Sequence, residues 1–125
     1  MDAIAIALLQ KTYAAFNARD LDGALAVMHP SVTWPNGMEG GNVYGHGGIR
    51  EYWTRQWAMI DPSVEPMRFT IADDGRVSVE VHQVVRDLTG RILKDTVVHH
   101  VYAFEDGLIK AMEIRDGERL ACSTL

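Results

Sequence analysis

The chain has 125 residues, of which 47% are hydrophobic and 23% are charged, and this composition predicts one globular domain spanning residues 1–125. The formal net charge of −5 argues against nucleic acid or an anionic membrane as a partner, because both reward clustered basic side chains. Cys122 is the single cysteine, which excludes a disulfide framework and a cysteine zinc site. Polar residues in the first predicted helix argue against a signal peptide or membrane span. We therefore expect a soluble, cytoplasmic protein.

The first half of the chain predicts helices. Over residues 3–18 the apolar stripe has helical spacing and consists of Ala5, Leu8, Leu9, Thr12, Tyr13 and Phe16. A short second helix follows Asp20 and ends before Pro30, because the residue preceding a proline is disfavoured in helical conformation. A short strand is predicted at residues 31–34, and a third helix over residues 48–60. The loop between them, residues 36–48, lacks the ending of a phosphate-binding loop and predicts a flexible flap.

The second half of the chain predicts strands joined by turns. They cover residues 67–72, 76–88, 92–104 and 108–115, with Asp-Gly or Thr-Gly pairs at the turns. Helices followed by an antiparallel meander indicate an α+β domain. We expect a cone in which three N-terminal helices pack on a curved antiparallel sheet.

Two adjacent histidines stand in the third of these strands. Successive side chains of a strand point to opposite faces, so His99 and His100 diverge. This divergence argues against a metal site, and we predict no metal and no cofactor. Both faces of the strand are largely apolar, which favours His100 in the interior and His99 on an outer face covered by a second copy of the chain. A homodimer through the outer sheet face is therefore expected.

The interior also contains aromatic and polar candidates. Trp34, Trp53 and Trp57 predict a flat aromatic cavity, or simply part of the core, and such a cavity suits a ring-containing ligand. Tyr13 and Tyr44 are candidate donors to a carbonyl oxygen. Asn36 has two interpretations, because its amide can polarise a carbonyl or form an Asx turn. His100 is the candidate acid–base group, since an unperturbed histidine titrates near neutral pH.

Four segments carry a resemblance to a known family: residues 16–25, 29–34, 45–53 and 101–109. Together they resemble the nuclear transport factor 2-like superfamily, over nearly the whole chain. The resemblance is closest to SnoaL-like polyketide cyclases and ketosteroid isomerases. It implies a cone-shaped fold with an interior pocket, and this superfamily uses that one pocket for many reactions.

The catalytic residues of ketosteroid isomerases do not carry over to this chain. In those enzymes a tyrosine and a protonated aspartic acid hold the enolate, and a second aspartate moves the proton. The matching positions are Thr12, with Tyr13 one residue away, then His100 for the acid and Trp34 for the base. The steroid isomerase mechanism is therefore not implied.

SnoaL-like cyclases are similar in having a histidine where His100 stands. Their partner aspartate falls on Ile114, which cannot take a proton. Asp116 lies two residues further along the same strand face and is the candidate replacement, provided the strand end curls inward. The resemblance also directs His82 and Val84 toward the pocket if a bulge near Gly90 shifts the strand, whereas simple burial directs the alternating valines inward instead.

Two functions remain open from the sequence. One is a cofactor-free enzyme that catalyses isomerisation, cyclisation or dehydration of a small ring-containing carbonyl substrate. His100 would transfer the proton, and Tyr13 or Asn36 would stabilise an oxyanion. The other is a non-catalytic module that binds an apolar ligand or dimerises. The partner of either is a small hydrophobic molecule. The predicted catalytic residues are His100, Tyr13 and Asp116, and the predicted pocket residues are Thr12, Phe16, Trp34, Asn36, Tyr44, Trp53, Trp57, His82, Val84, Tyr102, Met112 and Ile114.

Overall fold

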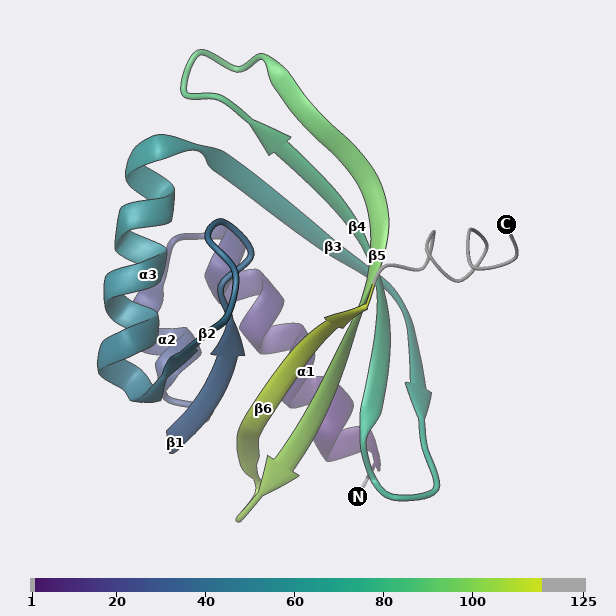
Figure 1. Ribbon diagram of the computed structural model, residues 1–125. Helices are drawn as coiled ribbons and strands as arrows, with labels where there is room; N and C mark the ends of the chain where they lie inside the picture. Colours follow the sequence, from purple (N-terminus) through teal and green to yellow (C-terminus); the bar gives the residue numbers. More distant parts are fainter. Residues whose placement is uncertain (1, 116–125) are drawn as a thin grey trace.

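The computed structural model describes residues 2–115, which form three helices and one six-stranded sheet. Figure 1 shows the strands curving around the helices, which lie on the concave side of the sheet. The elements in chain order are α1 (Asp2–Asn17), α2 (Leu21–Leu25), β1 (Met28–Pro35), β2 (Asn42–Tyr44), α3 (Gly45–Met59), β3 (Asp61–Ile71), β4 (Val77–Arg86), β5 (Ile92–Glu105) and β6 (Leu108–Arg115). The predicted α+β class is confirmed.

The sheet is mixed rather than antiparallel throughout. Its strand order is β2-β1-β6-β5-β4-β3. Strand β1 runs parallel to β6, with Met28 opposite Ile109 and Thr33 opposite Ala111, while every other pair of neighbouring strands is antiparallel. Local sequence patterns do not reveal this pairing, because the two strands are separated by most of the chain. The helices also do not form one N-terminal block, since β1 and β2 come between α2 and α3.

Strand β3 is longer than its sequence predicts because it is an edge strand. It begins at Asp61, whereas the alternation indicated a start at Met67. Pro62 and Pro66 lie inside it, and proline is tolerated at an edge because one side of the strand needs no ladder donor. Because proline is unusual inside strands, the sequence did not predict the first half of β3.

The glycine-rich segment after β1 holds a short strand and the start of a helix. Strand β2 pairs with β1, and α3 begins at Gly45. Gly45 has a φ of +73°, and a Cβ on it would lie 3.2 Å from the Pro30 carbonyl oxygen. Glycine therefore suits both the backbone angle and the close approach to β1. The buried face of α3 that follows carries Ile49, Tyr52 and Trp53.

The core lies between the helices and the concave face of the sheet. Val77, Val79 and Val81 of β4 are 0 to 1% exposed and belong to one apolar cluster that also contains Leu9. Alternation along β4 thus directs the valines inward. Within the described part of the chain, no helix is both long and apolar enough to cross a membrane.

Replacing Leu9 with alanine tests how much this core stabilises the fold. Leu9 is fully buried on α1, so Leu9→Ala is expected to lower the free energy of unfolding by about 3 kcal/mol through lost burial and the cavity left behind. Urea unfolding followed by tryptophan fluorescence measures the change. Ile4→Ala on the same helix is the control, because Ile4 is 69% exposed and its truncation is expected to cost less than about 0.5 kcal/mol. Equal losses in the two variants would contradict this packing.

Candidate functional site

A cavity of about 330 Å³ lies between α1, α3 and the concave face of the sheet. Nine of the residues predicted for the site line it: Thr12, Tyr13, Phe16, Trp34, Trp53, His100, Tyr102, Met112 and Ile114. The sequence did not single out the others, which are Pro35, Gly37, Met38, Tyr52, Gln56, Ile60, Val64, Gln83, Val85, Leu93 and Lys94. Gln83 and Val85 continue the inward alternation of β4, and this signal was available in the sequence.

Two tyrosines and a histidine form a hydrogen-bonded chain in this cavity. The Tyr102 hydroxyl donates to the Tyr13 hydroxyl over 2.8 Å, and the Tyr13 hydroxyl lies 2.8 Å from His100 Nδ1. His100 and Tyr102 share one face of β5 because they are two residues apart, and Tyr13 comes from the facing side of α1. The tertiary fold therefore brings together groups that are 87 and 89 residues apart in the chain.

Burial keeps all three groups of this chain uncharged. His100 is 6% exposed, and desolvation, aided by the neighbouring His99, lowers its pKa from 6.5 to about 4. Burial raises the pKa of Tyr13 well above its usual value, and it raises the pKa of Tyr102 as well. At neutral pH the site therefore holds a neutral imidazole and two protonated phenols.

A neutral chain of this kind has two hydrogen-bond arrangements. Tyr102 donates to Tyr13 in both. In the first, Tyr13 donates to Nδ1 of His100, and Nε2 of the ring carries the proton. In the second, Nδ1–H donates to the Tyr13 oxygen, so that the Tyr13 proton and the Nε2 lone pair are both available to a ligand. The second arrangement offers a hydrogen-bond donor and a base side by side.

Aromatic rings form the walls beside these polar groups. The Trp34 and Trp53 rings meet edge to face at 5.6 Å, and Phe16 meets Trp53 at 4.9 Å. Trp57 does not line the cavity; it packs behind Phe16 and Trp53 with the Arg19 guanidinium 5.2 Å from its ring centroid. Offset and edge contacts of this kind fix the rings in place and leave flat faces toward a ligand.

The residues expected at the pocket from β4 and β2 lie elsewhere. His82 faces the outer side of the sheet, where its Nε2 lies 2.7 Å from Asp95 Oδ1, and Val84 shares that outer face. The register shift in the β4–β5 pairing comes only after Val85, so it cannot turn His82 inward. Tyr44 is 67% exposed at the end of β2 and lies outside the cavity lining.

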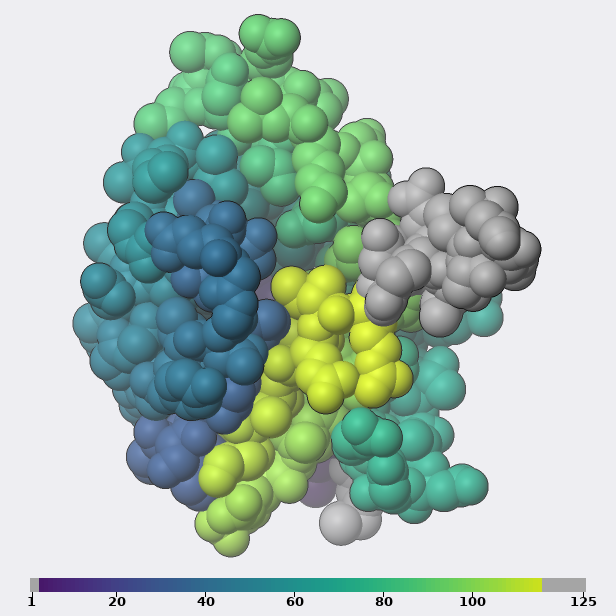
Figure 2. Space-filling view, in the orientation of Figure 1, coloured from purple at the N-terminus to yellow at the C-terminus, as the bar shows by residue number. Residues whose placement is uncertain are grey.

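Asn36 shapes the cavity mouth without lining it. Its side-chain oxygen accepts the backbone N–H groups of Met38 and Glu39, which is the Asx turn of the two interpretations. The Tyr52 hydroxyl accepts the Gly37 N–H over 2.9 Å, which fixes the same loop to α3, and burial raises the pKa of Tyr52. The loop lies beside the end of β6. In Figure 2 the loop is blue and β6 is yellow, and a recess lies next to the place where the two surfaces meet.

No carboxylate lines the cavity within residues 2–115. Ile114 pairs with His100 across β5 and β6 and occupies the place where the resemblance expects an aspartate. Asp116, the candidate replacement, lies outside the described residues. Among the described lining residues His100 is also the one histidine, so the cavity walls offer no set of side chains that would chelate a metal.

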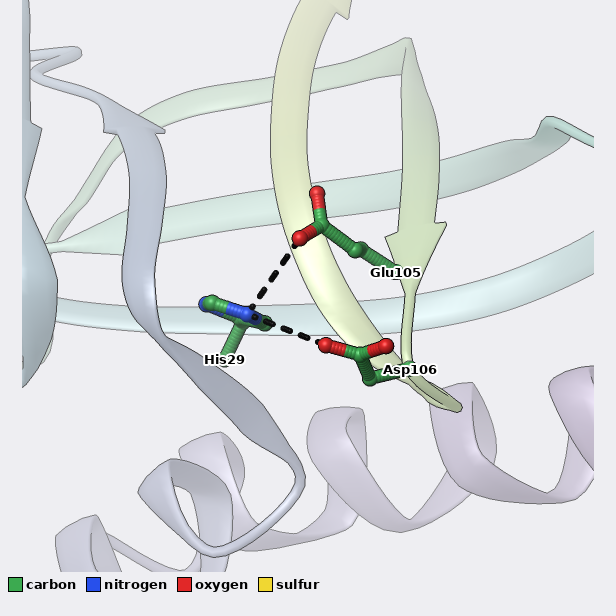
Figure 3. Close-up of side chains that lie close together, drawn as sticks. All are labelled: His29, Glu105 and Asp106. Carbon is green, nitrogen blue, oxygen red and sulfur yellow. Dashed lines mark ion pairs between the residues drawn. The ribbon is translucent and has the colours of Figure 1, made fainter.

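A histidine and two carboxylates gather at a separate place, the turn between β5 and β6. Figure 3 shows His29 Nε2 lying 3.6 Å from oxygens of both Glu105 and Asp106. His29 Nδ1 accepts the backbone N–H of Ser31 over 3.0 Å, so the neutral ring carries its proton on Nε2. A protonated Nε2 that faces the two carboxylates has no lone pair left with which to ligate a cation. The cluster is therefore explained as a polar contact between β1 and the turn.

Comparison with known proteins places the chain in a family. Residues 9–112 match the family model of the SnoaL-like domain. The chain belongs to this SnoaL-like family. The resemblance noted in the sequence is thus confirmed, and other structural neighbours are described as a putative polyketide cyclase and as having a ketosteroid isomerase-like fold. A search of curated proteins gave no match.

Solved structures of other proteins show the same fold at sequence identities from 17% to 30%. TerC, whose crystal structure was determined with polyporic acid, is 30% identical in sequence to this chain. The match covers 94% of this chain and 95% of TerC, with a TM-score of 0.78. An ntf2-like protein of unknown function from Burkholderia pseudomallei is 26% identical, with 94% of each chain covered and a TM-score of 0.77. RV0760c from Mycobacterium tuberculosis, in complex with estradiol-17beta-hemisuccinate, is 17% identical, covers 89% of this chain and 92% of that chain, and has a TM-score of 0.77.

The lowered pKa of His100 predicts a specific dependence of stability on pH. Unfolding returns the pKa from about 4 to 6.5, so the unfolded chain binds this proton more tightly. The contribution of His100 to stability is therefore complete above pH 6.5 and is lost as the pH falls from there toward 4. Between pH 7 and pH 5 the wild type is expected to lose about 2 kcal/mol more stability than His100→Gln. Urea unfolding at both pH values measures this difference, and parallel losses would contradict a buried neutral His100.

Proposed function

We propose that the cavity binds a small ring-containing carbonyl compound and that His100 and Tyr13 transfer a proton on it without a cofactor. The observation that carries this proposal is the buried contact of 2.8 Å between the Tyr13 hydroxyl and His100 Nδ1 in an aromatic cavity. A donor and a base held together in a site of low polarity are the elements of enolisation chemistry. The reaction class is isomerisation, cyclisation or dehydration.

The second hydrogen-bond arrangement supplies the proposed mechanism. Tyr13 donates its proton in a hydrogen bond to the carbonyl oxygen of the ligand while it accepts from Tyr102 and from His100 Nδ1. His100 Nε2 then takes the proton from the carbon next to the carbonyl, and the electron pair of that C–H bond forms the enolate. The enolate oxygen is held by Tyr13, and its negative charge offsets the unfavourable burial of the imidazolium.

The fate of that proton distinguishes the three reactions. Its return from Nε2 to another carbon of the enolate gives an isomer. Its transfer to a hydroxyl group that departs as water gives a dehydration. Attack of the enolate carbon on a second carbonyl forms a ring, and the new alkoxide takes the proton. Each outcome returns His100 to its neutral state, so no oxidant, metal or cofactor is required.

Ligands in related structures support the choice of ligand class. A protein that is 30% identical to this chain was co-crystallised with polyporic acid, and a more distant protein with the same fold was crystallised with an estradiol derivative. The cavity volume of about 330 Å³ is at the lower end of the range for small-molecule sites, which favours a ligand of two or three rings.

A second candidate function is ligand binding without catalysis. The observation favouring it is Ile114, which stands where the resemblance expects a carboxylate, together with the strongly lowered pKa of His100. A base with a pKa of about 4 is a weak proton acceptor unless the substrate stabilises its charged form. In this case the chain of tyrosines and histidine holds the oxygen of a bound ligand.

Exchange of ring-ketone protons separates the two candidates. Wild-type protein is expected to accelerate hydrogen–deuterium exchange at the acidic carbon of 2-tetralone, measured by NMR. His100→Gln and Tyr13→Phe are each expected to reduce the rate about 100-fold, because one removes the base and the other the oxyanion donor. The rate is expected to fall as the pH drops through about 4, where His100 becomes protonated.

Tyr44→Phe is the matched control for this measurement, since Tyr44 is an exposed tyrosine outside the cavity. Thermal shift with 2-tetralone provides the second measurement. A ketone that raises the melting temperature without faster exchange would favour the binding module. A ketone that does neither would contradict both candidates.

We also propose that two copies associate through the outer face of the sheet. Val97, Val101 and Ala103 of β5 share this face, and His99 Nδ1 lies buried there with no hydrogen-bond partner among residues 2–115. Val97 and Ala103 are half-buried there, and a second copy would cover them. Sedimentation analysis is expected to find a dimer that Val97→Glu converts to a monomer. Leu88→Glu, at an exposed position in the turn after β4, is the control that should remain dimeric, and a monomeric wild type would contradict the association.

A further inference from the structure

We propose that the ligand is an elongated acid, with a ring system between an oxygen held by His100 and Tyr13 and an anionic group held by Lys94. This inference rests on the proposed function and specifies its ligand class. The observation behind it is that the described residues lining the cavity include one lysine, Lys94, and no arginine, aspartate or glutamate.

Lys94 faces the cavity because of its position in the β4–β5 ladder. Lys94 pairs with Val85 of β4, and His100 pairs with Val79. Both partners lie on the inward-facing side of β4, so Lys94 and His100 lie on the concave face of β5. Its neighbour Asp95 points to the opposite face and contacts His82 there. The cation is therefore directed toward the cavity mouth by the strand itself.

No acidic side chain of the described part of the chain neutralises this cation. Lys94 takes part in no ion pair within residues 2–115, and no Asp or Glu from these residues lines the cavity. The chain as a whole has a net charge of −5, so the lysine in the cavity wall has the opposite sign to the net charge of the protein. Lys94 is exposed at the edge of the cavity, so a ligand with an anionic end would supply the missing counter-charge in a partly exposed ion pair.

The separation of the two polar ends sets the length of the ligand. Lys94 and His100 are six residues apart on β5, which corresponds to about 20 Å along an extended strand. The flexible lysine side chain can reach back toward the cavity, and the curvature of β5 in Figure 1 shortens the path. The two polar groups of the ligand are therefore separated by a rigid body of at least two linked aromatic rings, with a polar substituent at each end.

Two probes of the same shape test the role of the anionic group. They are 4-phenylphenol and 4′-hydroxybiphenyl-4-carboxylate, which differ only in the carboxylate opposite the hydroxyl. The wild type is expected to bind the carboxylate probe about fivefold more tightly, the usual size of a partly exposed ion pair. Lys94→Gln is expected to remove this preference, so that the two probes bind with equal affinity, and Lys94→Arg is expected to retain the preference. Isothermal titration calorimetry measures these affinities.

Arg91→Gln is the matched control, because Arg91 is an exposed cation close to Lys94 in the chain that does not line the cavity. This variant should keep the full preference for the carboxylate probe. Equal affinity of the wild type for the two probes, or a preference that persists in Lys94→Gln, would overturn the inference and leave the proposed function intact. If neither biphenyl binds while 2-tetralone does, the inference fails alone. If none of the three compounds binds, the proposed function fails as well.

Discussion

The hydrogen bond between Tyr13 and His100 is the contact on which the rest of the site depends. It joins α1 to β5 inside the cone and lies in surroundings where an unsatisfied polar atom would be costly. Tyr102 completes the chain and gives the Tyr13 oxygen a second partner. Because the three groups are buried and uncharged, the hydrogen bond between Tyr13 and His100 can run in either direction, according to which neutral tautomer His100 adopts, without creating a charge. This freedom makes the same set of side chains suitable for holding a ligand oxygen and for moving a proton.

The chemistry of the cavity is limited as much by what lines it as by its shape. The described walls contribute aromatic and aliphatic side chains, one neutral histidine, phenols, amides and a single lysine. A histidine whose pKa is about 4 acts as a base only when a negative charge develops beside it, and an enolate meets this condition. By the resemblance, Trp34 stands where the isomerases have their base and Ile114 where the cyclases have their aspartate. Neither side chain can take a proton, so a reaction in this cavity would depend on His100 and the tyrosines.

Alternation along the strands predicted more of the site than the family resemblance did. It directed His100 inward and the valines of β4 into the core, and the structure places them there. The resemblance directed His82 and Val84 inward through a bulge, but the register shift follows Val85 and leaves both on the outer face. Lys94 was overlooked because a lysine near a turn resembles an ordinary solvated residue. Alternation within the predicted strand already put Lys94 on the face of His100, but only the tertiary structure shows that the cavity extends to it.

The sequence by itself determined the α+β class, the family and the inward direction of the key histidine, because these depend on local periodicity and on contiguous motifs. It could not determine the parallel pairing of β1 with β6, the partner of Tyr13 or the role of Asn36. Those features depend on contacts between residues far apart in the chain, and the curvature of the sheet decides which of them meet. The tertiary structure therefore decided that Tyr13, Tyr102 and His100 form one hydrogen-bonded chain and that Lys94 faces the same cavity.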